Sequence, residues 1–457
     1  MQYTTRDHLK AYLVLGLPLV GSHVAQMSIT LIDTLMLGWY DVDALAAQVL
    51  AGTMFFVFFI FGSGFAWAVM PKVAQAEGAN DERGARRTTR MGLWASIMFG
   101  MAVMPLFLWA EPVLVALGQT PELAAMGADY LAIAGWGIFP ALMVMTLKSF
   151  LAALEKTQAV LWITVAAVFA NALVNYALIF GNWGAPELGI VGAAWASLVV
   201  QVLSFVLIVA YAQIATPEHQ LFVRFWRADW EAFGEVFRLG WPIGITALAE
   251  VGLFAASSVM MGWLGTLPLA AHGIAMQVIS LAFMVHLGLS NAATVRAGRA
   301  YGRGDISGLR HGAYTVFAMS AVVAVVAVVI FLTIPEVLLS AFLDPTDPDA
   351  PAVMAIGVGL MAAAALFQLV DAAQVMALGV LRGVQDTRVP MLIAGVAYWV
   401  IGVPASYVLG ISLGYGGVGI WLGLALGLAV AAVLLIWRFL RWQPAADHSS
   451  VRAGEQG

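Results

Sequence analysis

The sequence predicts an all-α, polytopic membrane protein with twelve transmembrane helices arranged as two pseudo-symmetric six-helix lobes. Three observations predict this fold class: the composition, the positions of the basic residues and an internal repeat. Of the 457 residues, 62% are hydrophobic and only 10% are charged. A soluble domain is about 25% charged, because its surface must face water. Most side chains of this chain must therefore face lipid or one another.

The basic residues divide the chain into pairs of spans. The 21 Lys and Arg residues fall in clusters that leave six long blocks without any basic residue. A membrane-spanning helix needs about 20 apolar residues, so each block is long enough for two helices and a turn. Turn-forming residues lie near the middle of every block. The blocks are 11–71, 91–147, 157–223, 239–295, 311–381 and 389–437.

The charge pattern also predicts an orientation. All the basic clusters fall on one side of the twelve predicted spans, and the opposite loops carry acids only. By the positive-inside rule the basic side is cytoplasmic, so both termini are expected in the cytoplasm. The apolar run 11–37 is too long for a signal peptide and is expected to remain as the first span.

An internal repeat relates the two halves. A shift of 224 residues aligns 15–86 with 239–310 without a gap. Two six-helix halves that both start at the cytoplasm form a parallel repeat, and such folds bind substrate between the halves. The most specific matches are Gly38-Trp39 with Gly262-Trp263, and Gly78-x-x-Asp81-x-x-Gly84-x-Arg86 with Gly302-x-x-Asp305-x-x-Gly308-x-Arg310.

The repeat and the charge clusters predict four segments. We expect an N-terminal lobe at 1–213, a cytoplasmic linker at 214–234 and a C-terminal lobe at 235–440. The remaining residues, 441–457, are expected to form a disordered cytoplasmic tail. The linker carries Arg224, Trp226, Arg227 and Trp230, a composition typical of the membrane interface.

Three acids fall inside predicted spans: Asp33, Glu250 and Asp371. A carboxylate at a helix centre costs about 2.5–3.5 kcal/mol on insertion scales, so such residues usually belong to ion or substrate pathways. No Lys or Arg is expected at the same depth. Each acid must then be protonated, hold a cation or reach water, which is what a site for coupling to H+ or Na+ requires.

Polar residues are predicted to support these acids. Asn171 and Asn175 lie one helical turn apart on a single face, and with Asp33 they are expected to form an oxygen-rich site, joined by Ser197. Interhelical packing by the amides is an equal alternative. Gln277 is expected to face a cavity because it lies deep in its span.

The sequence resembles the multidrug and toxic compound extrusion (MATE) family, in particular its bacterial NorM-type branch. The resemblance covers about residues 8–440 and follows the family's order of motifs. The residues that carry it are Ile32-Asp33-Thr34-Leu35-Met36-Leu37-Gly38, Val73–Gly78, Gly184–Gly189, Arg238–Pro242, Glu250–Phe254, Ala270-Ala271-His272, Asp371–Val375 and Gly379–Gly383.

The resemblance implies a fold of the MATE/MOP type, whose two lobes open alternately to each side of the membrane. It implies export of organic, often cationic, compounds driven by inward H+ or Na+. Glu250 and Asp371 correspond to the cation site of the second lobe, where Na+ binding is possible, and Asp33 to the polar site of the first. Gln26, Phe367 and Gln374 are predicted to line the substrate cavity.

One position departs from the family pattern. Four residues before Asp371, where NorM-type relatives often have tyrosine, this chain has Phe367. A hydroxyl ligand for Na+ is missing there, which favours proton coupling.

Two other transporters remain as alternatives: a lipid-linked precursor flippase of the same superfamily and a major-facilitator-like importer. A flippase would favour a basic cavity at membrane depth, and an importer a longer central loop. An enzyme is not expected, since no nucleophile, metal or P-loop motif is present. No cofactor and no nucleic acid is predicted to bind. The expected partners are small organic substrates and the lipid bilayer, with the protein as a monomer.

Overall fold

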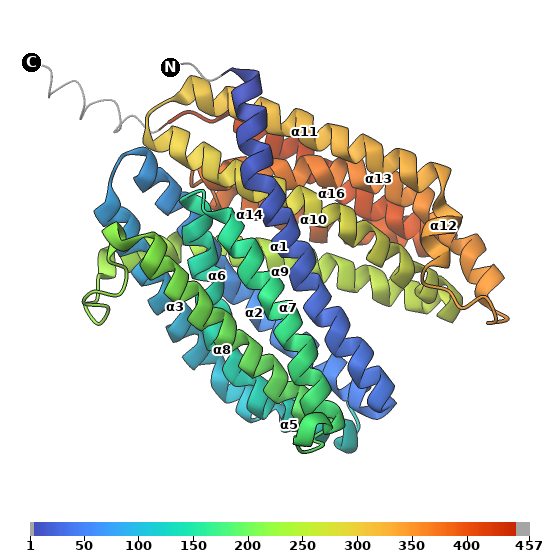
Figure 1. The fold of residues 1–457 in the computed structure, drawn as a ribbon. Helices are drawn as coiled ribbons and strands as arrows, with labels where there is room; N and C mark the ends of the chain where they lie inside the picture. The colour runs from blue at the N-terminus through green and yellow to red at the C-terminus, as the bar shows by residue number, and fades with distance from the viewer. Residues whose placement is uncertain (1–3, 445–457) are drawn as a thin grey trace, which may run out of the picture. The chain divides into compact units, whose positions relative to one another are not determined.

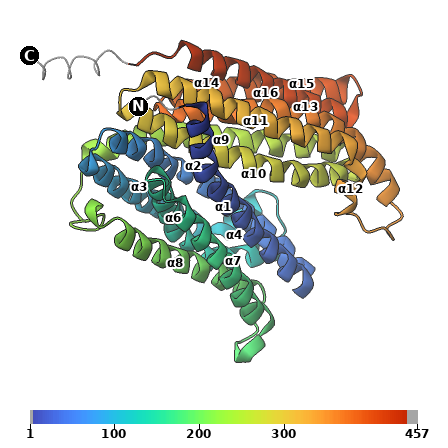
Figure 2. The same cartoon turned by 45° about the horizontal axis from the view of Figure 1, so that its top comes forward.

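The structure is a computed structural model that describes residues 4–444. Within that range the regular structure is helical, with no strand (Figure 1, and from a second direction Figure 2). Twelve helices are long and apolar enough to cross a membrane. The predicted all-α fold with twelve spans is therefore confirmed. Most of the predicted tail, 441–457, lies outside the described residues.

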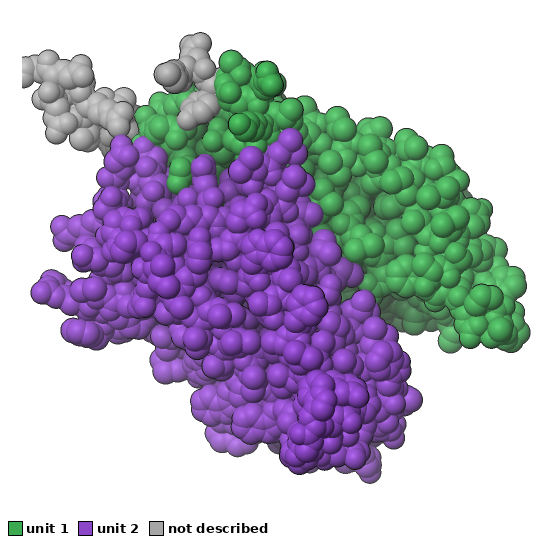
Figure 3. Space-filling view, in the orientation of Figure 1, with its two compact units in different colours: residues 1–12, 249–457 green, residues 13–248 purple. Residues whose placement is uncertain are grey.

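Two compact units divide the chain, residues 1–12 with 249–457 and residues 13–248 (Figure 3). Helix α1 (Thr5–Tyr40) starts in the first of these units and continues in the second. Helix α9 (Trp230–Leu264) starts in the second and continues in the first. The predicted boundaries of the transport lobes, 1–213 and 235–440, remain a prediction.

The unit of residues 13–248 is built around α2, which contacts α3, α5 and α6, while α7 and α8 pack against each other. One of its spans is broken by a short 3-10 turn and includes both α5 and α6. The elements are α2 (Val42–Gly78), α3 (Glu82–Leu108), α4 (Ala110–Ala116), α5 (Pro121–Ala134), η1 (Gly135–Gly137), α6 (Ile138–Ala153), α7 (Thr157–Phe180), η2 (Asn182–Gly184), α8 (Ile190–Ala215) and η3 (Pro217–His219).

The unit of residues 1–12 and 249–457 is built around α13, which contacts both α10 and α16 (Figure 2). One span, 388–412, alternates between α-helical and π-helical turns. The elements are α10 (Thr266–Gly302), α11 (Ile306–Thr333), α12 (Pro335–Ser340), α13 (Ala350–Gly383), α14 (Arg388–Gly395), η4 (Val396–Gly402), α15 (Val403–Tyr407), η5 (Val408–Ser412) and α16 (Gly416–Arg441).

Small residues bring α10 and α13 into backbone contact. Ser290 Oγ donates to Val375 O at 2.8 Å, and Thr294 Oγ1 donates to Gly379 O at 2.8 Å. A Cβ added at Gly379 would lie 2.6 Å from the backbone oxygen of Ser290, closer than real Cβ atoms approach. Between membrane helices such close approach and hydrogen bonding take the place of the hydrophobic effect. The contact fixes the helix that carries Asp371.

The repeated loop motif has the same structure in both halves. Asp81 caps α3 by accepting from Gly84 N at 2.8 Å, and Asp305 caps α11 by accepting from Gly308 N at 2.8 Å. A side-chain oxygen at the N-cap satisfies an amide that has no partner within the helix. A Cβ at either glycine would lie within 2.2 Å of the capping carboxylate, so a larger residue there would displace the cap. At this turn the repeat is therefore present in the structure as well as in the sequence.

Candidate functional site

Helices α1 and α7 bring Asp33 against the two predicted asparagines. Asn171 Nδ2 donates to Asp33 Oδ1 at 2.9 Å, and Asn175 Nδ2 donates to the same oxygen at 2.6 Å. Asp33 is 8% exposed and both asparagines are fully buried. The carbonyl oxygens of both amides are buried without a hydrogen-bond partner among the described residues. Unpaired acceptors of this kind are costly unless a proton or cation reaches them.

Ser197 contacts this site only through a neighbour. Its Oγ lies 3.3 Å from the hydroxyl of Tyr130, and no hydrogen bond to Asp33 is present. Tyr130 interacts with Gln48 and electrostatically with Asp33. Tyr130 is thus the missed member of the cluster, since an aromatic residue in an apolar run gives no distinguishing signal in the sequence.

Glu250 on α9 and Asp371 on α13 lie close enough to interact electrostatically. Asp371 is 2% exposed. Glu250 Oε1 and Asp371 Oδ1 are both buried and have no hydrogen-bond partner among the residues described. An unpaired buried carboxylate is very unfavourable, so these two carboxyl groups with unsatisfied oxygens are the candidate site for a proton or a cation.

Amide and hydroxyl groups surround Asp371 on the same unit. Gln368 and Gln374 of α13 are buried, and the side-chain oxygen of each is also without a partner in the described chain. Gln374 Nε2 donates to the hydroxyl of Tyr398 at 2.6 Å. Tyr398 lies in the π-helical segment η4 and interacts electrostatically with both Glu250 and Asp371. Segments of π-helix often occur at functional sites.

A basic residue near the end of α13 adds to this cluster. No basic residue was expected at the depth of the acids, yet Arg382 interacts electrostatically with Glu250 and Tyr398. The reason is the length of α13, which continues through Arg382 to Gly383, so that Arg382 belongs to the helix and not to a loop. Lys148 similarly lies within α6, where it interacts with His23. Of the three acids, Glu250 consequently has a basic neighbour.

Phe367 packs into an aromatic cluster. Its ring centroid is 5.9 Å from that of Phe254 and 5.5 Å from that of Trp421, and its side chain is 1% exposed. Trp421 Nε1 donates to His272 Nδ1 at 3.1 Å. Because this ring nitrogen accepts, His272 is neutral and carries its proton on Nε2, toward Ser258. His272 is thereby held as a packing residue.

The remaining predicted residues are separate from these clusters. Gln26 and Gln277 have exposed side chains, and neither forms a hydrogen bond with one of the three acids. Their role in a substrate cavity stays a prediction, as does that of the buried Phe367 and Gln374. No group of three or more His, Cys, Asp or Glu side chains suited to a metal ion occurs in residues 4–444. The oxygen donors present suit a proton or a hard monovalent cation.

Twelve apolar spans with unsatisfied carboxyl oxygens buried among them define a multi-pass membrane transporter. The chain belongs to the MatE family, whose sequence model matches residues 18–177 and 242–408. The resemblance identified from the sequence is confirmed.

Relatives and solved structures agree with this assignment. The chain is 48% identical over 436 residues to a protein of Rhizobium meliloti described as a probable multidrug resistance protein NorM, covering 95% of this chain and 93% of the relative. A protein of Agrobacterium fabrum with the same description is 47% identical over 436 residues, covering 95% and 94%. The crystal structure of a MATE protein in complex with MaL6 superposes with a TM-score of 0.87 at 18% identity, covering 95% and 96%. This last similarity concerns the fold.

Proposed function

We propose that the protein is a secondary active multidrug efflux transporter, which exports organic and often cationic compounds in exchange for H+ or Na+. The descriptions of the relatives support multidrug efflux. We further propose that it works as a monomer in a bacterial inner membrane with both termini in the cytoplasm. On this view it needs no cofactor, binds no nucleic acid and catalyses no reaction.

A single observation carries the choice of the coupling site. Glu250, Asp371 and Arg382 form an electrostatically linked group, and the two acids keep buried oxygens without partners among the described residues. Arginine is charged at every physiological pH, so it compensates only one of the two carboxylates. The group is therefore neutral when it holds one H+ or Na+, and also when it faces one monovalent cationic substrate.

This charge balance supplies an exchange mechanism. A ligand shifts a two-state equilibrium only if it binds the two states differently. In our proposal the inward-moving cation and the outgoing substrate compete for the same unpaired negative charge. Binding of the cation releases the substrate, and binding of the substrate releases the cation. Between these two binding events the protein changes the side of the membrane to which the charged group is exposed.

Asp33 forms a second coupling site in this proposal. Asp33 Oδ1 already accepts two amide donors, while the asparagine oxygens remain without partners in the described chain. A proton on the free carboxyl oxygen, or a cation between the carboxyl and amide oxygens, would complete the set. The equal alternative of a purely structural interhelical contact is tested below.

The choice between Na+ and H+ rests on the hydroxyl groups near Asp371. Phe367 supplies none, which favours H+. Tyr398 provides a hydroxyl from another helix, but its oxygen already accepts from Gln374. We therefore propose H+ as the main coupling ion.

The flippase alternative requires basic residues at membrane depth that are free to bind a pyrophosphate headgroup. Arg382 interacts with Glu250, so its charge is already engaged. The importer alternative has no structural observation in its favour.

Dye transport in inverted membrane vesicles tests the proposal. In such vesicles export is measured as uptake, and a proton gradient and a sodium gradient are imposed separately. We expect the proton gradient to drive uptake of a cationic fluorescent dye. Uptake driven only by sodium would reassign the coupling ion, and uptake driven by neither gradient would overturn the proposal.

A further inference from the structure

A large basic cavity lies between the start of α3 and the segment 216–229 that joins α8 to α9. Its volume is about 950 Å³, and α3, the joining segment and the start of α9 all contribute to its wall. Six arginines but only two carboxylates line it, an excess of four positive charges. The arginines are Arg83, Arg86, Arg87, Arg90, Arg224 and Arg227.

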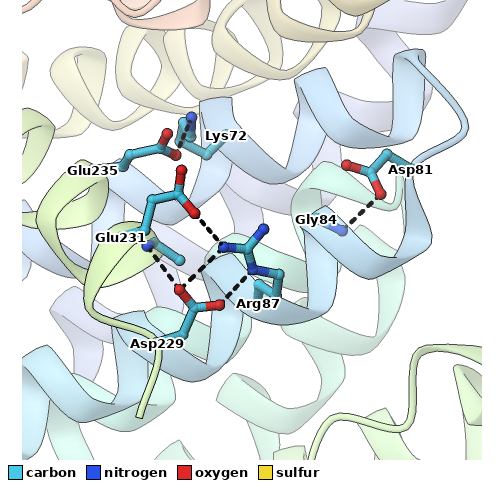
Figure 4. A network of polar contacts seen from close by, with 8 residues as sticks. Lys72, Asp81, Gly84, Arg87, Asp229, Glu231 and Glu235 are labelled. Atoms are coloured by element: carbon cyan, nitrogen blue, oxygen red, sulfur yellow. Dashed lines mark hydrogen bonds and ion pairs between the residues drawn. The ribbon is translucent and has the colours of Figure 1, made fainter.

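One arginine, Arg87, already pairs with both carboxylates. Arg87 binds Asp229 through two nitrogens and Glu231 at 2.9 Å (Figure 4). The hydrogen bond from Arg87 lowers the pKa of Asp229, as do the amide of Ala232 and the charge of Arg83. Asp229 is therefore ionised at neutral pH. No further carboxylate lines the cavity to compensate the other arginines.

The wall of the cavity is held in place by backbone contacts. Arg90 donates through Nε to Leu221 O at 2.6 Å and through Nη2 to Gln220 O at 2.8 Å. Trp94 Nε1 donates to Phe225 O at 3.0 Å. These bonds fasten the joining segment to α3, so the arginines of both elements converge on a preformed space.

Arg86, Arg224 and Arg227 have no hydrogen bond or ion pair from their side chains to another residue in the described part of the chain. Charges needed only for membrane topology do not have to converge, because the positive-inside rule counts residues near the ends of spans. Convergence of like charges is unfavourable unless an anion compensates them. A guanidinium group matches phosphate in particular, through paired N–H donors.

The surroundings point to phosphate at the membrane surface. Trp226 of the joining segment and Trp230 at the start of α9 are both exposed, and Trp230 also lines the cavity. Exposed tryptophans are typical of the interface, where lipid headgroups carry their phosphates. Basic pockets at such positions recognise anionic lipid headgroups.

We propose that this cavity binds a negatively charged phosphate group, through the guanidinium groups of Arg86, Arg224 and Arg227. The source is either an anionic lipid headgroup or a soluble phosphate compound, and the experiment separates the two. The proposal is independent of the transport site, since none of the three acids discussed above lines the cavity.

The test measures binding to the purified full-length protein in a neutral detergent. One probe is dihexanoyl phosphatidylglycerol, and the other is inorganic pyrophosphate. The variant R86Q/R227Q removes two uncompensated charges, and the matched control R310Q/R388Q removes two exposed arginines from α11 and α14. We expect R86Q/R227Q to weaken binding of at least one probe about tenfold or more, and the control to leave it unchanged.

If R86Q/R227Q loses binding of phosphatidylglycerol but not of pyrophosphate, the cavity is a lipid headgroup site. If it loses binding of pyrophosphate but not of phosphatidylglycerol, the ligand is a soluble phosphate compound. Equal affinities of the wild type and R86Q/R227Q for both probes would overturn the proposal, as would an equal loss in the control. If R86Q/R227Q does not fold, the proposal is tested by binding to the wild-type protein. It must prefer phosphatidylglycerol to phosphatidylcholine, or bind pyrophosphate, with an affinity that falls as salt rises. Failure on both counts overturns the proposal.

Discussion

Asn175 Nδ2 donates to Asp33 Oδ1 at 2.6 Å, joining α7 to α1 across 142 residues of sequence. Asn171, one turn away, donates to the same oxygen. The arrangement leaves both amide oxygens buried without partners among the described residues. A contact that served only to hold two helices together would be expected to satisfy these atoms, so their lack of partners favours a site for a proton or cation.

Asn175→Ala should lower the transport rate about tenfold, because Asp33 loses one of two amide donors and such a bond is worth about 1.5–3 kcal/mol. The matched control is Ser197→Ala, which removes a contact to Tyr130 but none to Asp33. Initial rates of dye uptake in inverted vesicles, corrected for the amount of inserted protein, give the result. Equal losses in the two variants would contradict a direct role for Asn175.

Tyr398→Phe should reduce both stability and transport. The change leaves Gln374 Nε2, a fully buried donor, without its partner, which costs about 1–3 kcal/mol. Tyr407→Phe is the control, because Tyr407 lies on the same span with an exposed side chain. Thermal unfolding of the purified proteins should show a lower midpoint for Tyr398→Phe alone. An unchanged midpoint would mean that the bond contributes nothing.

Gly379→Ala should destabilise the contact between α10 and α13 by about 1–3 kcal/mol, since the added methyl group would overlap Ser290. Gly395→Ala in α14 is the matched control, because a Cβ there meets no atom within 4 Å. Alanine is also the better helix former, by up to about 1 kcal/mol. We expect the two substitutions to move the unfolding midpoint in opposite directions. An unchanged unfolding midpoint for Gly379→Ala would show that α10 and α13 can move apart to accommodate the methyl group without a cost in stability.

His219 should make stability depend on pH. Its Nε2 lies 2.9 Å from Glu77 Oε1, and this hydrogen bond raises the pKa of His219 above the ordinary value of 6.5. The folded state therefore holds the proton more tightly than the unfolded state. The resulting stabilisation is complete below about pH 6.5 and is lost as the pH rises through the folded-state pKa.

Relative to the wild type, His219→Gln should consequently be destabilised by about 1 kcal/mol in mildly acidic solution and by less in alkaline solution. Unfolding midpoints of both proteins across this pH range provide the comparison. A difference that grows as the pH rises would be opposite in sign to the prediction.

The sequence was sufficient for the spans and for one of the two polar clusters. Twelve helices could be predicted because apolar length and basic clusters follow directly from the cost of placing charge in lipid. Asn171 and Asn175 could be paired because a spacing of four residues puts two side chains on one helix face. Their contact with Asp33 required only that one more polar residue lie at the same depth.

The neighbours of Asp371 could not be predicted in the same way. Tyr398 follows it by 27 residues and lies in a π-helical segment, where the usual periodicity of 3.6 residues does not indicate which side chains face inward. Arg382 was assigned to a loop because charge near the end of a span is normally solvated. The 34-residue helix α13 is longer than a span requires, and it brings Arg382 within range of Glu250.

The central claim is that Glu250 and Asp371 share one exchangeable positive ion. Dye uptake driven by a proton gradient in inverted vesicles tests it most directly, with Glu250→Gln, Asp371→Asn and, as control, Glu111→Gln, an acid with an exposed side chain. We predict that each of the first two changes abolishes uptake while the protein remains inserted in the membrane, and that the control transports normally. Normal uptake by both Glu250→Gln and Asp371→Asn would contradict the account.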